Sequence, residues 1–398
     1  GREAAAESGF SLGQLAEPSK PEYDQIFLNG NQAISLGASH AGLQFYAGYP
    51  ISPATSILVW MEDNLVGPGK FAYQVSSEIE AITSIIGAGY SGAKSMTATA
   101  GPGFSLMSEG LGLAWMAEIP CVIVDVQRGG PATGLPTKTE QSDLLNAVSP
   151  AHGDVFLPVI APGTVEECFY ATVDAFNWAE RYQGPVVLLS EHALSEREQN
   201  IAKPDLSKVV VETRKVYNGE HGYHRYEGDE LTPMPIPGKP GSYVANASEH
   251  DGMGDTTHLP SRHVQMTERR FSKLKLLENG SYESRNTACP VALMPWGGSK
   301  GPSLEAYNLL VESDIEIAWY YTMYLNPLPP DLLKELREKE LVLVPELNYL
   351  GQFSSLLRSQ GVAAESITQY TGLPFHVNSL VDTVLKRITE KAKERISA

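Results

Sequence analysis

The chain has 398 residues, with 30 Lys and Arg against 47 Asp and Glu, which gives a formal net charge of −17. Hydrophobic residues make up 42% of the sequence, enough for a globular core, so a disordered or collagen-like chain is excluded. The acidic balance argues against a nucleic-acid-binding protein, because such proteins need basic surface to neutralise phosphates.

The sequence contains no recognisable membrane span, signal peptide or cysteine-based metal motif. No apolar segment approaches the roughly 18 uncharged residues that a membrane span needs, and we recognise no signal peptide. The three cysteines, Cys121, Cys168 and Cys289, lie far apart without a CxxC pair. We therefore expect a cytoplasmic protein that binds no membrane and builds no metal or iron–sulfur site by itself.

The length predicts two or three domains. Residues 1–23 are small, polar and proline-bearing, which favours a linker or arm. Residues 24–201 alternate short strands with longer helices, which predicts a parallel sheet with helices on both faces. The expected strands are 43–47, 71–75, 95–99, 121–127 and 185–190. The expected helices are 31–41, 53–64, 77–92, 103–117 and 164–182.

Residues 202–285 break this alternation, because 202–262 alone carries six prolines and seven glycines. The composition indicates an extended crossover, and a disordered linker is the alternative. Five of the nine histidines fall here, but no cysteine or dense carboxylate spacing supports a metal site. Residues 286–398 return to alternation and predict a second, smaller α/β domain. Its expected strands are 291–294, 315–319, 341–344 and 364–369, and its expected helices are 301–312, 331–339, 352–360 and 377–395.

A strand-to-helix turn carries two glutamates with different expected roles. Ser77 as the helix N-cap and Glu80 three residues later fit a capping box, followed by a buried stripe that begins at Ile79. Capping leaves Glu78 unassigned. Taken alone, Glu78 could be a carboxylate that favours the positive end of the helix, rather than a functional group.

Two further segments lie where strands end. The residues 99–103, TAGPG, join a strand to a helix, and their glycines either allow close approach of another surface or form an ordinary tight turn. Arg128 follows a buried strand at the edge where α/β folds place ligands. It is either an ion-pair anchor or a binder of a carboxylate, which a guanidinium matches bidentately.

Together these segments resemble a known family. Gly48-Tyr49-Pro50, then Glu78, then the TAGPG loop resemble the pyrimidine-binding domain of thiamine diphosphate enzymes. Tyr49-Pro50-Ile51-Ser52-Pro53 is similar to the YPITP signature of 2-oxoacid:ferredoxin oxidoreductase alpha subunits, with Ser52 replacing the usual threonine but keeping the hydroxyl. Further similar segments are the substrate loop (127–131, 133–137 and 140–144), the transketolase C-terminal-like domain (296–299 and 346–352) and a crossover of the 2-oxoglutarate branch (249–263).

The resemblance implies a fold and a reaction. The fold is a parallel-sheet, pyrimidine-type thiamine diphosphate-binding domain (24–201), the crossover (202–285) and a smaller transketolase C-terminal-like α/β domain (286–398). The reaction is CoA-dependent oxidative decarboxylation of 2-oxoglutarate to succinyl-CoA with reduction of ferredoxin, or the reverse carboxylation of a reductive TCA cycle.

The resemblance also implies roles for individual residues. Glu78 would hydrogen-bond N1′ of the cofactor's aminopyrimidine, and Pro50 and Ile51 would pack near its ring. The substrate would be held by Tyr49, Ser52 and Arg128, with Arg128 also close to the cofactor. Lys138 is the nearby candidate for the distal carboxylate of 2-oxoglutarate.

The rest of the machinery is expected on other chains. A beta-type subunit would carry the diphosphate and Mg²⁺ site and a [4Fe-4S] cluster, giving a heterodimer, and a gamma-type domain is expected upstream because the chain begins with Gly1. Two alternatives stay open: a pyruvate or branched-chain 2-oxoacid enzyme, and a non-catalytic interaction subunit that keeps the fold.

Overall fold

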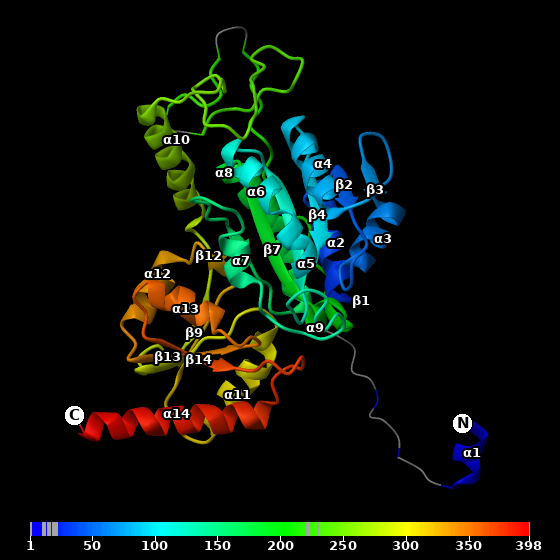
Figure 1. Cartoon of the computed structure of the whole chain (residues 1–398). Coiled ribbons are helices and arrows are strands. Elements are labelled where there is room, and N and C mark those ends of the chain that lie inside the picture. The colour runs from blue at the N-terminus through cyan, green and yellow to red at the C-terminus, as the bar shows by residue number, and fades with distance from the viewer. Residues whose placement is uncertain are drawn as a thin grey trace.

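A computed structural model describes residues 2–9, 13, 17, 23–219, 223–228 and 231–397. Most of the arm predicted at 1–23 lies outside the described residues, which include a short helix, α1 (Arg2–Glu7). Apart from a two-stranded ribbon, two sheets organise the rest of the described chain, the larger above the smaller in Figure 1. Among the described residues, no helix is long and apolar enough to cross a membrane.

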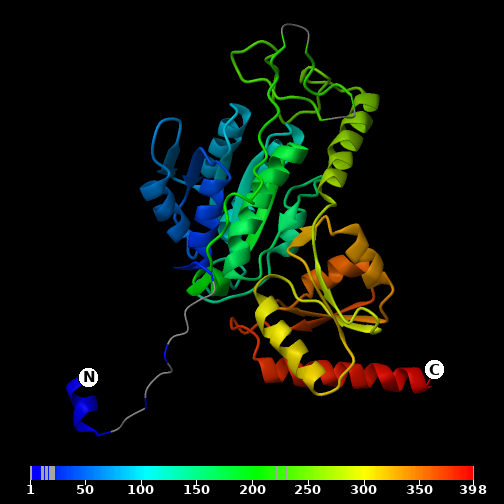
Figure 2. The same cartoon turned by 180° about the vertical axis from the view of Figure 1, so that it is seen from behind.

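The large sheet has seven strands in the order β12-β6-β7-β5-β4-β2-β3. All neighbours are parallel except β12, which runs antiparallel to β6. Helices cover both faces, with α2 and α8 on one and α4, α5 and α6 on the other (Figures 1 and 2). In chain order the strands are β2 (Phe45–Gly48), β3 (Phe71–Gln74), β4 (Ser95–Thr99), β5 (Cys121–Gln127), β6 (Val159–Ile160), β7 (Pro185–Glu191) and β12 (Tyr324–Asn326). The helices are α2 (Gly30–His40), α3 (Thr55–Asn64), α4 (Glu78–Tyr90), α5 (Gly101–Leu106), α6 (Ser108–Met116), α7 (Leu144–Val148), α8 (Val165–Tyr182) and α9 (His192–Ser195).

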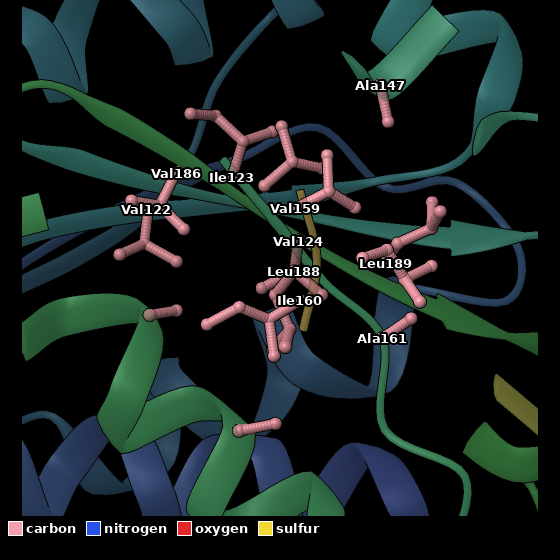
Figure 3. Packing of buried hydrophobic residues seen from close by; sticks show 14 of the residues in the cluster. Val122, Ile123, Val124, Ala147, Val159, Ile160, Ala161, Val186, Leu188 and Leu189 are labelled. Carbon is pink, nitrogen blue, oxygen red and sulfur yellow. The ribbon is translucent and has the colours of Figure 1, made fainter. Parts of the chain in front are cut away.

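The core of this domain forms around β5 and β7, whose residues are all buried. Strands buried on both faces read as continuous apolar runs, as CVIVDVQ and PVVLLSE do. Successive side chains alternate between the faces: Ile123 lies toward Ala147 of α7, whereas Val124 lies on the opposite face (Figure 3). Asp125 interrupts the apolar run inside β5 and, by this alternation, shares the face of Ile123.

The smaller sheet has the order β14-β13-β10-β11-β9, in which only β9 is antiparallel to its neighbour. Helix α14 lies below this sheet in Figure 1. The strands are β9 (Glu283–Arg285), β10 (Val291–Leu293), β11 (Ala318–Tyr321), β13 (Leu341–Glu346) and β14 (Ala364–Thr368). The helices are the 3₁₀ turn η2 (Gly297–Ser299), α11 (Lys300–Glu312), α12 (Pro330–Arg337), α13 (Gln352–Ser359) and α14 (Val377–Ser397).

The described part of the crossover is attached to the large domain. A two-stranded ribbon, β1 (Gln25–Leu28) with β8 (Gln199–Ala202), precedes it, and helix α10 (Pro260–Ser272) with the 3₁₀ turn η1 (Lys273–Leu277) ends it. Buried Glu118 receives Arg269 Nε at 2.9 Å and Lys273 Nζ at 2.8 Å, and Arg225 Nη1 lies 3.8 Å away. Burial by itself would raise the pKa of Glu118, but these three cations lower it overall. The ionised carboxylate therefore ties the crossover and α10 to the end of α6.

Several expected elements differ in detail. The helix predicted at 103–117 is two helices, α5 and α6, which meet at Met107. Ile79 was expected in the buried stripe of α4 but is 55% exposed, and Ile82, Ile85 and Ile86 form the buried stripe instead. Strand β12 comes from the C-terminal part of the chain yet joins the large sheet, where it pairs with β6. Strands of two or three residues are too short for periodicity to reveal.

Candidate active site

The candidate site lies at the carboxyl ends of the parallel strands, where α/β sheets bind ligands. Glu78 is the first residue of α4, after the short turn that follows β3, and is only 6% exposed. The TAGPG turn after β4 packs against it. An ideal Cβ on Gly103 would collide with Thr99 Oγ1 and lie 2.6 Å from Glu78 Oε1. The close approach therefore requires glycine at 103, which favours the packing interpretation of this turn over an ordinary tight turn.

The neighbouring Ser77 and Glu80 have the structural role expected of them. Ser77 Oγ accepts a hydrogen bond from Glu80 N at 3.2 Å as the helix N-cap. The Glu80 carboxylate reaches one residue further back than in a standard capping box, accepting from Ser76 N at 2.8 Å and Ser76 Oγ at 2.6 Å. These hydrogen bonds lower the pKa of Glu80. Capping thus occupies Glu80 and leaves Glu78 available.

Arg128 is buried at the end of β5, and the structure brings it to Ser52. Its Nη1 donates to the backbone oxygen of Ser52 at 2.6 Å, while its buried Nε has no partner in the described chain. The guanidinium therefore retains donor capacity. Arg128 lines a cavity of about 260 Å³, with Gly101, Ser105, Pro131, Asp143 and Asn146 among the other lining residues.

The remaining residues of the Tyr49–Pro53 segment stand beside this pair. Tyr49 and Ser52 are exposed, whereas Pro50 and Ile51 are half-buried. Asn31 Nδ2 donates to Pro53 O at 2.9 Å and thereby fixes the turn to α2. The exposed side chains leave this surface free to contact a cofactor, a substrate or another chain.

Lys138 lies apart from the cavity. Its side chain is exposed, and it is not among the cavity-lining residues. The Lys138 carbonyl accepts a hydrogen bond from Gly129 N at 3.0 Å, so Arg128 and Lys138 stand at the two ends of one loop.

Two carboxylates of this site were missed in the sequence analysis. Asp125 belongs to β5 and is fully buried, with neither carboxylate oxygen hydrogen-bonded within the described chain. Asp143 precedes α7, and its Oδ2 is also buried without a partner. Burial and the neighbouring Asp143 raise the pKa of Asp125 well above its usual range. The signal in the sequence was an aspartate inside the apolar run CVIVDVQ.

The segment 140–144 also joins the two sheets. Gln141 N donates to Leu347 O at 2.7 Å, and Gln141 Nε2 donates to Trp296 O at 2.8 Å. Asn348 Nδ2 in turn donates to Gln141 O at 3.0 Å. Gln141 therefore joins three segments that are distant in sequence: 140–144, 296–299 and 346–352.

The residues at Glu78 fit thiamine diphosphate, the cofactor that the resemblance implies. Glu78 is only 6% exposed, and its carboxylate makes no hydrogen bond within the described chain. A buried carboxyl normally has a partner, and a ring nitrogen of a ligand would supply one here. Glu78 and the half-buried Pro50 and Ile51 are therefore the residues that would hold the pyrimidine.

Comparison with protein families agrees with this geometry. Residues 36–269 match the family described as pyruvate flavodoxin/ferredoxin oxidoreductase, thiamine diphosphate-binding. The chain belongs to this family. The predicted family and thiamine diphosphate-binding domain are thereby confirmed.

Individual relatives cover most of the chain. It is 36% identical to the 2-oxoglutarate synthase subunit KorA of Methanocaldococcus jannaschii, over 82% of this chain and 89% of that protein. The structure of a 2-oxoglutarate:ferredoxin oxidoreductase from Magnetococcus marinus, with 2-oxoglutarate, coenzyme A and succinyl-CoA bound, superimposes with a TM-score of 0.92. It is 36% identical and is matched over 97% of this chain and 70% of that one.

Other curated relatives are longer, and the chain spans 61% and 63% of two of them. A split-gene transketolase, 12% identical with a TM-score of 0.50 over 86% of this chain and 89% of that one, shares the fold only. The predicted fold class, a thiamine diphosphate-binding domain with a smaller α/β domain, is confirmed by these likenesses.

Proposed function

We propose that this chain is the alpha-type subunit of a 2-oxoglutarate:ferredoxin oxidoreductase. The reaction converts 2-oxoglutarate, coenzyme A and oxidised ferredoxin to succinyl-CoA, carbon dioxide and reduced ferredoxin, or runs in reverse as a carbon-fixing carboxylation. The observation that carries the proposal is that two functional side chains lie at the carboxyl ends of the parallel strands. They are Glu78, which is buried and has no hydrogen bond in the described chain, and Arg128, which is buried and keeps a free donor. The names and ligands of the relatives support the choice of 2-oxoglutarate.

Each residue has one task in this proposal. Bound thiamine diphosphate would supply a nucleophilic carbon for reaction at the 2-oxo group. Glu78 shares a proton with N1′ of its pyrimidine, and Pro50 and Ile51 pack against the ring. Arg128 binds the C1 carboxylate of the substrate through its planar donors and keeps it facing the cofactor. The Ser52 hydroxyl and Tyr49 border the 2-oxo group.

Lys138 is assigned to the distal carboxylate of 2-oxoglutarate. It is a flexible, exposed cation at the far end of the loop that starts at Arg128. A dicarboxylic substrate carries its two charges at opposite ends, so two cations on one loop suit it. Pyruvate and branched-chain 2-oxoacids lack the second carboxylate and would gain nothing from Lys138.

The proposal includes a partner. A beta-type subunit would bind the diphosphate through Mg²⁺ and carry a [4Fe-4S] cluster that passes electrons to ferredoxin. The three cysteines of this chain are free. They are widely separated, as suits a cytoplasmic subunit that leaves the cluster to its partner in a heterodimer.

The test is anaerobic purification of the chain with its partner, followed by assays with 2-oxoglutarate, pyruvate and a branched-chain 2-oxoacid. We expect reduction of ferredoxin that depends on coenzyme A and thiamine diphosphate, with the highest kcat/KM for 2-oxoglutarate. A higher kcat/KM for pyruvate would reassign the substrate. A complex that binds no thiamine diphosphate and reduces no ferredoxin with any of the three would support the non-catalytic interaction subunit.

A further inference from the structure

A buried acidic pair lies beside the arginine of the candidate site and has no task in the proposed reaction. Asp125 and Ile123 point to the same face of β5, the face that α7 covers. Gln127, two residues on, reaches the start of α7, where its Oε1 accepts a hydrogen bond from Asp143 N at 3.1 Å. Asp125 therefore lies beneath the segment that carries Asp143.

The other side of Asp143 faces the TAGPG turn and the cavity. An ideal Cβ on Gly101 would lie 2.8 Å from Asp143 Oδ2, so that carboxylate fills the place of a side chain at 101. Asp143 and Arg128 line the same cavity of about 260 Å³. Among the described residues that line this cavity, Asp143 is thus the acidic one, beside the arginine.

The two carboxyls cannot both be ionised without cost. Three of their carboxylate oxygens are buried without a partner: Oδ1 and Oδ2 of Asp125 and Oδ2 of Asp143. An ionised carboxylate can only accept hydrogen bonds. One proton placed on Asp125 converts an acceptor into a donor and reduces the repulsion. Like-charged carboxylates that share a site commonly hold a single proton in this way.

The charged neighbours decide which carboxyl titrates near neutral pH. Burial and the neighbouring Glu140 raise the pKa of Asp143 to about 6, against the opposing effect of Arg128. The other elements packed near Asp143 contribute uncharged groups: Gly101 from α5, Asn146 from α7 and Gln352 from α13. Asp125 stays protonated at neutral pH, while Asp143 is largely ionised and attracted by Arg128.

We propose that Asp125 and Asp143 form a proton-sharing pair that balances the charge of Arg128 in the empty site and takes up one proton when a substrate carboxylate binds there. The inference rests on the proposed function. Binding replaces the Asp143 carboxylate with the substrate carboxylate as the counter-charge of Arg128. Asp143, deprived of that stabilisation, then accepts a proton from solvent. When the carboxylate leaves as carbon dioxide, Arg128 again favours ionised Asp143, and the same proton is released.

Asp143 and Asp125 act through Arg128 and are positioning residues, so the test is a pH profile of the complete enzyme complex. For wild type, kcat/KM for 2-oxoglutarate should fall about tenfold per pH unit above about pH 6, because binding then requires a proton. We call this fall the alkaline limb of the profile. Asp143→Asn imitates the protonated state, so its kcat/KM should show no alkaline limb. At about pH 8 its kcat/KM should be at least that of wild type. If Asp143 had a structural role alone, Asp143→Asn would lower kcat/KM at every pH.

Two further variants keep the test decisive. Glu140→Gln removes a repelling charge and should move the limb to lower pH, and Asp125→Asn keeps a neutral donor and should leave the limb in place. The proposal is overturned if Asp143→Asn retains the alkaline limb. It is also overturned if Glu140→Gln does not move the limb to lower pH, or if Asp125→Asn moves or removes it. Pyruvate should show the same limb, since it shares the C1 carboxylate. A change of preferred 2-oxoacid would therefore refute the substrate assignment without touching the pair.

Discussion

The Glu78 carboxylate occupies the space that a side chain at position 103 would fill, because an ideal Cβ on Gly103 lies 2.6 Å from Glu78 Oε1. The two residues come from different loops, one after β3 and one after β4. Parallel strands bring these loops to one edge of the sheet. The backbone at position 103 thus limits where the Glu78 carboxylate can lie, and a glycine is needed there to leave room for it.

Glu78→Gln should abolish turnover while leaving the fold intact. Glutamine keeps the size of the side chain but cannot share a proton with the cofactor, a contribution of about 10²- to 10⁴-fold. The measurement is exchange of the C2 proton of bound thiamine diphosphate, together with kcat. Glu80→Gln is the control, since glutamine can still cap the helix, and its activity should stay within severalfold of wild type. Wild-type exchange in Glu78→Gln would remove Glu78 from the mechanism.

Gly103→Ala should lower kcat by about 10²-fold, the cost of displacing a reacting group by roughly 1 Å. The new methyl group would push against Glu78 and Thr99. Steady-state kinetics with saturating thiamine diphosphate measures the effect. Gly87→Ala is the matched control, because an ideal Cβ on Gly87 meets nothing within 4 Å. Equal activity of the two variants would show that Glu78 moves without consequence.

Arg128→Lys should lower kcat/KM for every 2-oxoacid tested. Lysine keeps the charge but loses the planar donors, and losing a buried, charge-assisted contact costs about 2–4 kcal/mol. This corresponds to roughly 30- to 1,000-fold in kcat/KM. An unchanged kcat/KM would leave Arg128 as an anchor for the Ser52 carbonyl alone.

Lys138→Met should discriminate between substrates. It removes the cation proposed for the distal carboxylate, so kcat/KM should fall for 2-oxoglutarate and stay constant for pyruvate or 2-oxobutyrate. The comparison of these kcat/KM values within one variant is its own control. An equal fall of kcat/KM for 2-oxoglutarate and for the monocarboxylic 2-oxoacids would refute the assignment of Lys138. It would not affect the assignment of Arg128.

Glu191→Gln should flatten the dependence of stability on pH. Burial raises the pKa of Glu191 to about 7. A carboxyl whose pKa is raised by folding contributes stability below its unfolded pKa and loses it as the pH rises towards 7. The loss amounts to roughly 3 kcal/mol. Thermal unfolding between about pH 4.5 and 8 measures it.

The matched control for Glu191→Gln is Glu365→Gln, since Glu365 is exposed. The control should keep the wild-type pH dependence. A wild-type slope in Glu191→Gln as well would show that Glu191 does not titrate in this range.

The sequence alone predicted most of the longer helices and strands and supplied the residues of the predicted site. Alternating apolar strands and capped helices predicted the main elements, because their signals lie within a few residues. The motifs around Pro50, Glu78 and Arg128 identified the family, because they resemble its signature segments. Their roles in binding stay predictions.

The tertiary structure alone decided which residues meet. Only folding brings Gln141 to Trp296 and Leu347, places β12 in the large sheet and sets Asp143 against Gly101. It also exposes Ile79, which the helical period had assigned to the core. Periodicity describes one helix or strand at a time, whereas burial and the protonation of Asp125 and Asp143 depend on segments that are distant in sequence.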